Sequence, residues 1–447
     1  MKLRWITLCF LALAIGLAGQ DQTTITITGT SKYRLAVPDF AAAAGVTAAE
    51  QAVFNQVLWN DLYQTAVVTM VGRSLYTASA PATDADLNSA VVRTAWTAPP
   101  LAIQRLVFGQ MVLVNGGLVV SGYLYDVSQP PGGGRLLARR YADPGTPAGA
   151  RAIAHQLADD IVAALGYGPG IASSKIAYIS NRGGSEEVWT MDYDGFNPQQ
   201  RTRLHGIAYS PRLSPSGQEL AFMSQIGVHQ KIQLLSLLTN KLLPFPSYRG
   251  LTMSPAWSPD GSKLAFAAKM GGQNLDIYTI NANGTGLRRL TRSSGYDNLS
   301  PVWNPKPPPG SDGQIAFVSS RTGQPQIYTM NADGSNQQRI PLGGYATSPS
   351  WSPNGLVLAF AWVRNGGGED SGALDIYLWY FQDQKYVQLT HNGERNDFPS
   401  WAPDGRHIVF QSGASYHKQL FSVAADGSVP VQLTHAGDNE MPNWSWH

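Results

Sequence analysis

Residues 170–447 repeat one pattern in which short apolar runs alternate with turns rich in proline, glycine and asparagine. The clearest copy begins Ser-Pro-Ala-Trp-Ser-Pro-Asp-Gly at 254–261 and continues with Leu-Ala-Phe at 264–266. A second phrase, Ile-Tyr-Thr-Ile-Asn-Ala-Asn-Gly at 277–284, and a Leu-Thr pair at 290–291 complete the unit. Apolar runs of this length between turn signals predict strands, so each unit predicts four short strands.

The spacing of the repeat predicts a β-propeller. Its leading proline recurs at intervals of 44, 46, 48, 50 and 43 residues, as Pro211, Pro255, Pro301, Pro349, Pro399 and Pro442. A unit of this length with four strands is typical of one propeller blade. We expect the Trp strand to be innermost, followed outward by the Leu-Ala-Phe strand, the Ile-Tyr strand and a Leu-Thr strand.

The two ends of the repeat predict how many blades there are and how the ring closes. Five Trp-type strands are followed by the rest of a blade, but the sixth, around Trp444, ends the sequence. Three apolar segments at 175–178, 188–192 and 201–204 lack an inner partner. We therefore expect the last strand to complete this first blade, which gives six blades and leaves no open sheet edge.

Residues 21–168 have a different pattern and predict an α/β domain with a mixed sheet. Thr47 and Glu50 form a capping box before a helix with an apolar stripe. Asn115-Gly116 predicts a two-residue hairpin turn, and a second helix is expected at 148–165. The expected strands are 24–28, 33–37, 67–71, 110–114, 118–125 and 135–141. We expect the propeller to occupy residues 169–447.

Residues 1–20 have the pattern of a secretory signal peptide. Lys2 and Arg4 precede an apolar run at 5–17 and small residues at 18–19, so cleavage is expected near Gln20 or Asp21. A retained signal anchor is the alternative. Cys9 is the only cysteine, so the exported chain is expected to have no disulfide and no lipid anchor on cysteine.

Composition and motifs argue against several classes of function. The net charge is +2 and only 14% of residues are charged, which offers no basic surface for nucleic acid. Gly-x-Ser-x-Gly, His-Glu-x-x-His and P-loop motifs are absent from the sequence. We therefore expect no enzyme activity, no cofactor and no metal site.

Two local constellations resemble catalytic or metal sites, and each has a structural interpretation that we favour. His155 and Asp159 are four residues apart on a predicted helix, which suits a hydrogen-bonded packing feature at a domain junction better than a catalytic pair. Asp192-Tyr193-Asp194-Gly195 resembles the start of a calcium loop, but the remaining ligands of that pattern are missing. We expect a hairpin turn there.

One face of the predicted propeller has the residues of a protein-binding surface. The connections from each outermost strand to the next innermost strand are expected at 204–209, 249–253, 292–299, 342–347, 391–397 and 436–440. They and their flanks contain polar and aromatic residues suited to anchors and hydrogen bonds, which solvated turns can also contain. The candidates are Tyr248, Arg292, Tyr296, Asp297, Asn298, Tyr345, Arg395, Asn396, Asp397, Asp438, Asn439 and Glu440.

The segment that follows the expected cleavage site is a second candidate for binding. It is rich in threonine and could add a strand to a partner's sheet, or could be a frayed terminus or an edge strand of its own domain. Its residues are Asp21, Gln22, Thr23, Thr24, Ile25, Thr26 and Ile27.

The repeats resemble those of the TolB family. The similarity extends to Arg-Leu-Ala-Val-Pro-Asp-Phe at 34–40, to Arg-Ala-Ile-Ala-His-Gln-Leu-Ala-Asp at 151–159 and to Ser-Lys-Ile-Ala-Tyr at 174–178. The chain departs from the pattern at Leu213, which replaces a Trp, and in a list of segments that comprises the strand at 232–238, the Pro-rich insertion at 305–309 and the Gly-rich loop at 365–372.

The resemblance implies a monomeric periplasmic adaptor of the Tol-Pal system that supports outer-membrane integrity and cell division. It also implies that the propeller face binds the peptidoglycan-associated lipoprotein Pal and that the N-terminal segment binds TolA. Two alternatives remain open from the residues alone: an enzyme that uses the propeller channel on an exported polysaccharide, and the propeller module of an exported peptidase.

Overall fold

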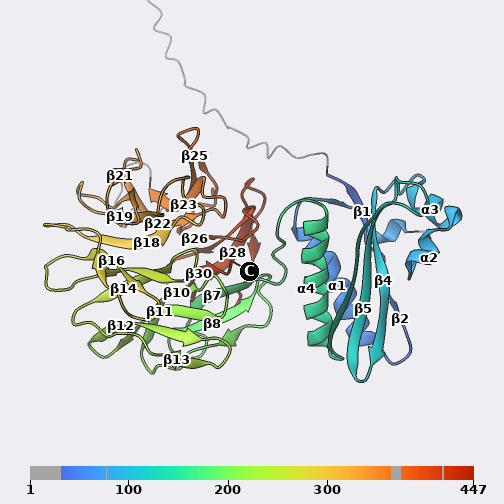
Figure 1. The fold of residues 1–447 in the computed structure, drawn as a ribbon, viewed down its shortest axis with the longest axis horizontal. Helices are drawn as coiled ribbons and strands as arrows, with labels where there is room; N and C mark the ends of the chain where they lie inside the picture. Colours follow the sequence, from blue (N-terminus) through green and yellow to red (C-terminus); the bar gives the residue numbers. More distant parts are fainter. Residues whose placement is uncertain (1–31, 77, 364–373, 415–416, 447) are drawn as a thin grey trace, which may run out of the picture.

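The computed structural model describes residues 32–76, 78–363, 374–414 and 417–446, which form an N-terminal α/β domain and a C-terminal propeller (Figure 1). The expected signal peptide at 1–20, the strand expected at 24–28 and the Gly-rich loop at 365–372 lie outside the described residues.

The N-terminal domain is built on a mixed sheet, as predicted. Its strands pair in the order β3-β1-β4-β5-β6, and β2 pairs with β4. Strand β1 is parallel to both β3 and β4, whereas β4, β5 and β6 run antiparallel. The strands are β1 (Arg34–Ala36), β2 (Ala41–Ala42), β3 (Thr69–Met70), β4 (Arg105–Val114), β5 (Gly117–Asp126) and β6 (Arg135–Pro144).

The hairpin between β4 and β5 forms at the predicted turn. Asn115 and Gly116 both have positive φ, of 51° and 78°, which matches the right-handed twist of the flanking strands. The two strands extend beyond the apolar runs because they pair over their full length, from Val114 opposite Gly117 to Arg105 opposite Asp126.

Two long helices cover the face of the sheet that is turned toward the propeller (Figure 1). They are α1 (Ala48–Gln64) and α4 (Pro147–Ala164). The predicted capping box is present, since the Thr47 hydroxyl accepts from the Glu50 N–H at 3.2 Å and the Glu50 carboxylate accepts from the Thr47 N–H at 2.8 Å. Both helices bury apolar residues against alternate positions of β4 such as Val107.

Three short helical segments that the sequence analysis did not predict cover the other face. They are η1 (Arg73–Leu75), α2 (Asp84–Leu87) and α3 (Ala90–Thr97). Trp96 and Leu87 are fully buried in one cluster with Phe108 of β4. Helices this short are unstable alone, so tertiary burial of Trp96 rather than local pattern stabilises them.

The propeller has six four-stranded blades over the described residues, which confirms the predicted number. The first comprises β7 (Lys175–Ser180), β8 (Glu187–Asp192), β9 (Gln199–Gln200) and the last strand, β30 (Asn439–Trp444). The second and third comprise β10 (Ile207–Leu213), β11 (Glu219–Ile226), β12 (His229–Ser236), β13 (Lys241–Leu243), β14 (Thr252–Trp257), β15 (Lys263–Ala268), β16 (Asp276–Asn281) and β17 (Arg288–Arg289).

The other three blades follow in chain order around the ring (Figure 1). They comprise β18 (Asn298–Trp303), β19 (Gln314–Ser319), β20 (Gln326–Asn331), β21 (Gln338–Arg339), β22 (Tyr345–Trp351), β23 (Val357–Val363), β24 (Asp375–Tyr380), β25 (Lys385–Gln388), β26 (Asn396–Trp401), β27 (His407–Ser412), β28 (Gln419–Ala424) and β29 (Val431–Gln432).

The ring closes as predicted, by pairing of the last strand with the first. Strand β30 lies antiparallel to β7, with Trp444 opposite Ile176. Trp444 is 1% exposed, and its indole N–H donates to the Ser174 hydroxyl at 2.7 Å. The same apolar cluster contains Trp444 and residues of α1 and α4, such as Leu157. Closure of the propeller and docking of the N-terminal domain therefore share one core.

Every inner strand in the described chain contains a β-bulge at its proline. In β14, Ser254 and Pro255 together lie opposite Phe266, and Ser254 has a φ of 52°. Because proline has no N–H, the bulge places it where the ladder requires no donor. The equivalent residues have φ between 50° and 52° and are Ser210, Ser300, Ser348, Phe398 and Met441.

The outermost strands do not include the Leu-Thr pair that the sequence analysis assigned to them. In three blades the Leu-Thr pair directly follows the outer strand, as Leu290-Thr291 follows β17. The Thr291 hydroxyl accepts from the Ile277 N–H at 2.9 Å, and Thr390 and Thr434 make the same bond to Ile376 and Leu420. A side-chain hydroxyl thus replaces the ladder acceptor there, and the regular strand ends before it.

Replacement of Trp444 by Ala is expected to lower the free energy of unfolding by about 3–5 kcal/mol, because it leaves a large cavity in the shared core. Chemical denaturation measures the change. Trp446→Ala is the matched control, since Trp446 is half-buried beyond the closing strand, and should cost less than about 1 kcal/mol. Equal losses in both variants would contradict the closing role of Trp444.

Candidate functional site

The two faces of the propeller have different surroundings. Because the strands of each blade alternate in direction, the outer-to-inner connections and the hairpins between second and third strands share one face, which we call the loop face. The N-terminal domain contacts the opposite face. Its partners there are Asp194 in the β8–β9 turn and Arg406 in the β26–β27 turn. The described part of the N-terminal domain, which begins at Lys32, therefore leaves the loop face free.

The structure divides the twelve predicted rim residues into two groups. Eight have accessible side-chain surface on or beside the loop face. Arg292 is exposed, and the other seven are half-buried. These eight are Tyr248, Arg292, Tyr296, Asp297, Tyr345, Arg395, Asp438 and Glu440. The other four are at most 4% exposed, and they are Asn298, Asn396, Asp397 and Asn439.

The buried asparagines bind neighbouring blades together, which corrects the expectation that they project from the rim. The Asn298 amide donates to the Asp276 carboxylate and to the Thr291 hydroxyl, both at 3.2 Å. Asn396 donates to Asp375 at 3.1 Å, and Asn439 donates to Gln419 at 3.0 Å. Each first residue of an inner strand thus reaches the third strand of the preceding blade, because a buried amide must be hydrogen-bonded.

Sequence reasoning missed this network, although a signal for it exists. An acidic or amide residue directly precedes the Ile-Tyr phrase in several units, as at Asp276, Gln326 and Asp375. The Thr of the Leu-Thr pair follows 15 residues after Asp276 and donates to its carboxylate at 2.7 Å. The repeated interval between these two polar positions could have predicted the contact.

Two arginines of the loop face were also missed. The Arg321 guanidinium lies 4.4 Å from the ring centroid of Tyr328 and 5.4 Å from that of Tyr296. Arg182 occupies the same place in the first blade, 5.1 Å from the ring of Trp189. Each also donates to a buried asparagine of the network. A Ser-x-Arg sequence at 180–182 and 319–321 was the available signal.

An acidic patch on the loop face lies beside the closing strand. Burial, and next the negative charge of Glu440, raises the pKa of Glu186 above its ordinary value. Lys418 forms an ion pair with Glu440 at 2.6 Å and partly compensates this charge. The patch and the arginine sites give the loop face charges of both signs, which suits selective recognition of a protein partner.

The domain junction is held by buried polar contacts that start from α1 and α4. Asp61 of α1 accepts from the Tyr193 hydroxyl of the propeller at 2.8 Å and lies 2.7 Å from Nδ1 of His155. His155 and Asp159 both lie at the junction as expected, but they do not pair with each other. Asp159 instead accepts from the N–H groups of Ala172 and Ser173 in the linker.

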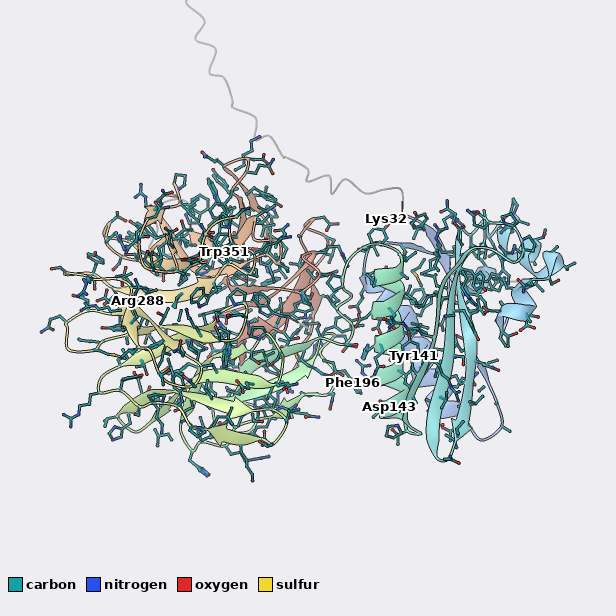
Figure 2. All side chains as sticks on the ribbon, in the orientation of Figure 1. Lys32, Tyr141, Asp143, Phe196, Arg288 and Trp351 are labelled. Carbon is teal, nitrogen blue, oxygen red and sulfur yellow. The ribbon has the colours of Figure 1, made fainter. Side chains whose placement is uncertain are left out.

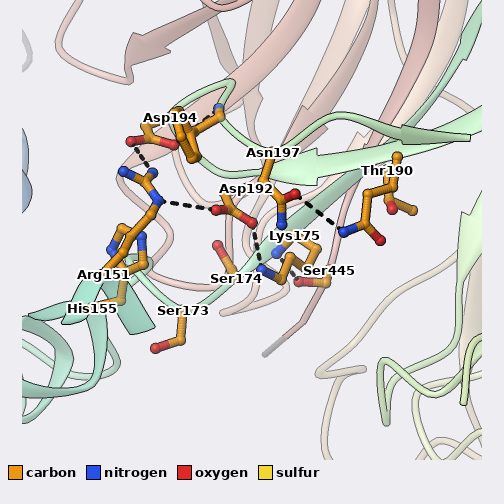
Figure 3. A network of polar contacts seen from close by, with 12 residues as sticks. Arg151, His155, Ser173, Ser174, Lys175, Thr190, Asp192, Asp194, Asn197 and Ser445 are labelled. Atoms are coloured by element: carbon orange, nitrogen blue, oxygen red, sulfur yellow. Dashed lines mark hydrogen bonds and ion pairs between the residues drawn. The ribbon is translucent and has the colours of Figure 1, made fainter. Parts of the chain in front are cut away.

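Figure 3 shows the ion pairs where α4 meets the first blade, of which those of Arg151 cross between the domains. Arg151 contacts Asp192 at 3.2 Å and Asp194 at 2.5 Å, and Lys175 contacts Asp192 at 2.5 Å. The ring of Phe196, which lies between the domains in Figure 2, is 4.2 Å from the Arg151 guanidinium. The segment that resembled a calcium loop is the β8–β9 turn, as expected, and its carboxylates bind these cations.

The described residues show neither a metal-binding cluster nor a membrane-spanning helix. No cluster of three or more His, Cys, Asp or Glu suited to a metal ion is found among them. None of the helices in the described part of the chain has the length and apolar character needed to span a membrane. The predicted partner segment, 21–27, lies outside the described residues, which begin at Lys32 (Figure 2).

Comparisons with known proteins agree with this architecture. A family model described as the TolB beta propeller domain matches residues 164–447. The Tol-Pal system protein TolB of Bordetella pertussis is 30% identical over 428 residues, covering 95% of this chain and 91% of the relative. The Protein TolB homolog of Chlorobium chlorochromatii is 34% identical over 214 residues, covering 48% of this chain and 45% of the relative.

A crystal structure shares the whole fold. TolB from Acinetobacter baumannii superposes with a TM-score of 0.75 at 23% identity, covering 93% of this chain and 97% of that one. Both the α/β domain and the propeller are therefore common to the two structures.

Replacement of Arg151 by Ala is expected to weaken docking of the two domains, because it removes charge-assisted bonds that are typically worth about 1.5–3 kcal/mol each. The Arg151 side chain is only 12% exposed. Limited proteolysis of the linker at 165–174 should become several-fold faster. Arg139→Ala is the matched control, since its pair with Asp160 lies within the N-terminal domain and Arg139 is 59% exposed.

Asp404 is expected to make the junction sensitive to acid. Burial raises the pKa of its carboxyl, but the hydrogen bond from His407 and the charges of His407 and Arg406 outweigh burial, so the pKa is lowered. A lowered pKa stabilises the fold above the ordinary value of about 3.9, and the contribution is lost as pH falls through the folded-state value. Asp404→Asn should reduce the slope of unfolding free energy against pH below about 4, measured by denaturation.

Proposed function

This chain belongs to the TolB family, and we propose that it acts as a non-catalytic adaptor of the Tol-Pal system in the periplasm. The relative from Bordetella pertussis is named Tol-Pal system protein TolB, and its similarity covers 95% of this chain. In this proposal residues 1–20 direct export and are removed. The adaptor then supports outer-membrane integrity and cell division by binding two partners at separate places.

The first proposed partner is the lipoprotein Pal, bound on the loop face. The observation that carries this assignment is that the N-terminal domain, over residues 32–168 that the structure describes apart from residue 77, contacts the opposite face of the propeller. Aromatic and arginine side chains such as Tyr296 and Arg321 stand there beside acidic residues such as Glu440. Aromatic and arginine anchors surrounded by polar groups are the usual source of binding energy at protein interfaces.

The second proposed partner is TolA, bound through the N-terminal segment that contains residues 21–27. The first described strand, β1, pairs on both sides, with β3 and β4. Strand β1 thus has no unpaired edge that another strand would need to cover. An extended segment can add to the sheet of a partner through main-chain hydrogen bonds.

The polar side chains that resemble catalytic or metal-binding residues in the sequence have structural partners in the fold. His155 contacts Asp61 within the domain junction, and Asp192 contacts Arg151 and Lys175. Both carboxylates are at most 4% exposed. Their roles in holding the domains together support an adaptor in preference to a hydrolase.

A charge reversal on the loop face tests the proposed Pal site. Arg292→Glu is expected to weaken binding of purified Pal at least about tenfold, about 1.4 kcal/mol, because it replaces an exposed cation by an anion in the contact. Isothermal titration calorimetry measures the affinity. Arg288→Glu is the matched control in the same blade, since the Arg288 guanidinium donates to the Asp333 carbonyl in a turn of the opposite face.

The N-terminal segment provides the complementary arm of this experiment. A chain that lacks residues 21–31 should lose TolA and retain Pal in a pull-down from an envelope extract. Loss of Pal on truncation, or equal Pal binding by both arginine variants, would contradict the division of partners between the two places.

A further inference from the structure

The inner strands surround a cavity of about 160 Å³ on the axis of the propeller. It extends from the proline bulges, such as Ser254 and Pro301, to Trp446 near the end of the described chain. A buried water needs about 10–15 Å³ of such volume, so the cavity has room for a small ligand or one inserted side chain.

Six residues occupy the same position in their inner strands, directly after the proline of the bulge, and all six line this cavity. In ring order they are Ser350, Ser400, Asn443, Arg212, Ala256 and Val302. The first four are adjacent around the ring and polar, whereas the last two are apolar. The cavity therefore has a polar arc along one side, formed by four consecutive blades.

The acceptor atoms of this arc are already used by the neighbouring blade. The Ser350 hydroxyl accepts from the Trp401 N–H at 3.2 Å, and the Ser400 hydroxyl accepts from the Trp444 N–H at 3.0 Å. The Asn443 carbonyl oxygen accepts from the Leu213 N–H at 2.7 Å. The Asn443 amide also donates one hydrogen to the Ser400 hydroxyl at 3.5 Å. The donors that remain are the two hydroxyl hydrogens and the second amide hydrogen.

Arg212 adds a positive charge to the same arc. Within the described residues it is the one charged side chain that lines the cavity. Its guanidinium donates to the Pro211 carbonyl at 2.9 Å, and its other donors have no protein acceptor among the described residues. Burial without a compensating charge lowers the pKa of Arg212 to about 10. The group still bears its full charge at neutral pH.

The carboxylates of the two preceding inner strands have cationic partners of their own, and Glu440 of β30 pairs with Lys418 at 2.6 Å. Asp397 accepts from the Ser348 hydroxyl and from the Phe398 N–H, both at 2.7 Å, and it forms an ion pair with Arg395 at 3.9 Å. A half-buried cation beside free donors is costly unless an anion joins it.

We propose that the polar arc formed by Ser350, Ser400, Asn443 and Arg212 is a binding site for a carboxylate inside the propeller channel. The planar guanidinium can donate two parallel hydrogen bonds to a carboxylate. The hydroxyls and the amide then donate to the same group, and Ala256 and Val302 face its apolar remainder. The carboxylate comes either from a small organic acid or from an acidic side chain that a docked protein inserts, and the second source rests on the proposed function.

Acetate is the probe for the site, titrated into the full exported chain at constant ionic strength with chloride as the balancing anion. Saturable binding is expected, followed by calorimetry and by the fluorescence of the tryptophans that line the cavity, such as Trp351. Arg212→Gln should weaken acetate binding at least tenfold. Arg292→Gln, on the exposed loop face, should leave it unchanged. Equal acetate binding by wild type and Arg212→Gln, or no binding by the wild type, overturns the proposal.

Stability separates a ligand site from a purely structural arginine. If Arg212 serves the ligand, Arg212→Leu should raise the melting temperature in the absence of acetate, because it removes an uncompensated charge. Its melting temperature should then be insensitive to acetate, whereas that of the wild type rises. A lower melting temperature for Arg212→Leu, with the wild type insensitive to acetate, assigns Arg212 to packing and overturns the proposal.

A competition experiment identifies the source of the carboxylate. If a docked protein inserts it, acetate should weaken Pal binding by the wild type but not by Arg212→Gln. If a free acid is the ligand, acetate binds and Pal affinity does not change. Failure of Pal to bind at all, with acetate binding intact, contradicts the proposed function and leaves the channel site supported.

Discussion

The pairing of β30 with β7 is the constraint on which the rest of the structure depends. Pairing of the last strand with the first removes the open sheet edge that the first blade would otherwise have. Here the closing tryptophan, Trp444, belongs to the same apolar cluster as the helices of the N-terminal domain. Loss of closure would therefore open the ring and weaken the domain junction together, so the two domains support each other through one core.

The domain junction makes the two faces of the propeller unequal. Arg151, Asp61 and Asp404 belong to contacts between the N-terminal domain and one face of the propeller. These contacts are buried, so their charges are paired or hydrogen-bonded rather than solvated. With one face occupied in this way, the loop face is the one to which we assign the proposed partner, and Arg182 and Arg321 on it contact aromatic rings and the buried asparagines.

The sixfold repeat also makes exceptions visible. At the channel-lining position directly after each bulge proline, five blades have uncharged residues and one has Arg212. The same blade has Leu213 where the others have tryptophan. The blades share one packing pattern, so a charged residue that departs from it without an ion-pair partner among the described residues is a candidate for function rather than for folding.

The sequence by itself determined the mixed α/β domain, the number of blades and the closure by Trp444, because repeat spacing, strand patterning and the capping box of Thr47 and Glu50 are local signals. It also placed His155 and Asp159 at the domain junction. Only the tertiary structure decided that Asn298, Asn396 and Asn439 are buried between blades, that α3 forms around Trp96, and that Asp61 is the partner of His155. These outcomes depend on residues that are distant in the chain but adjacent in space, and no local periodicity encodes which of them will meet.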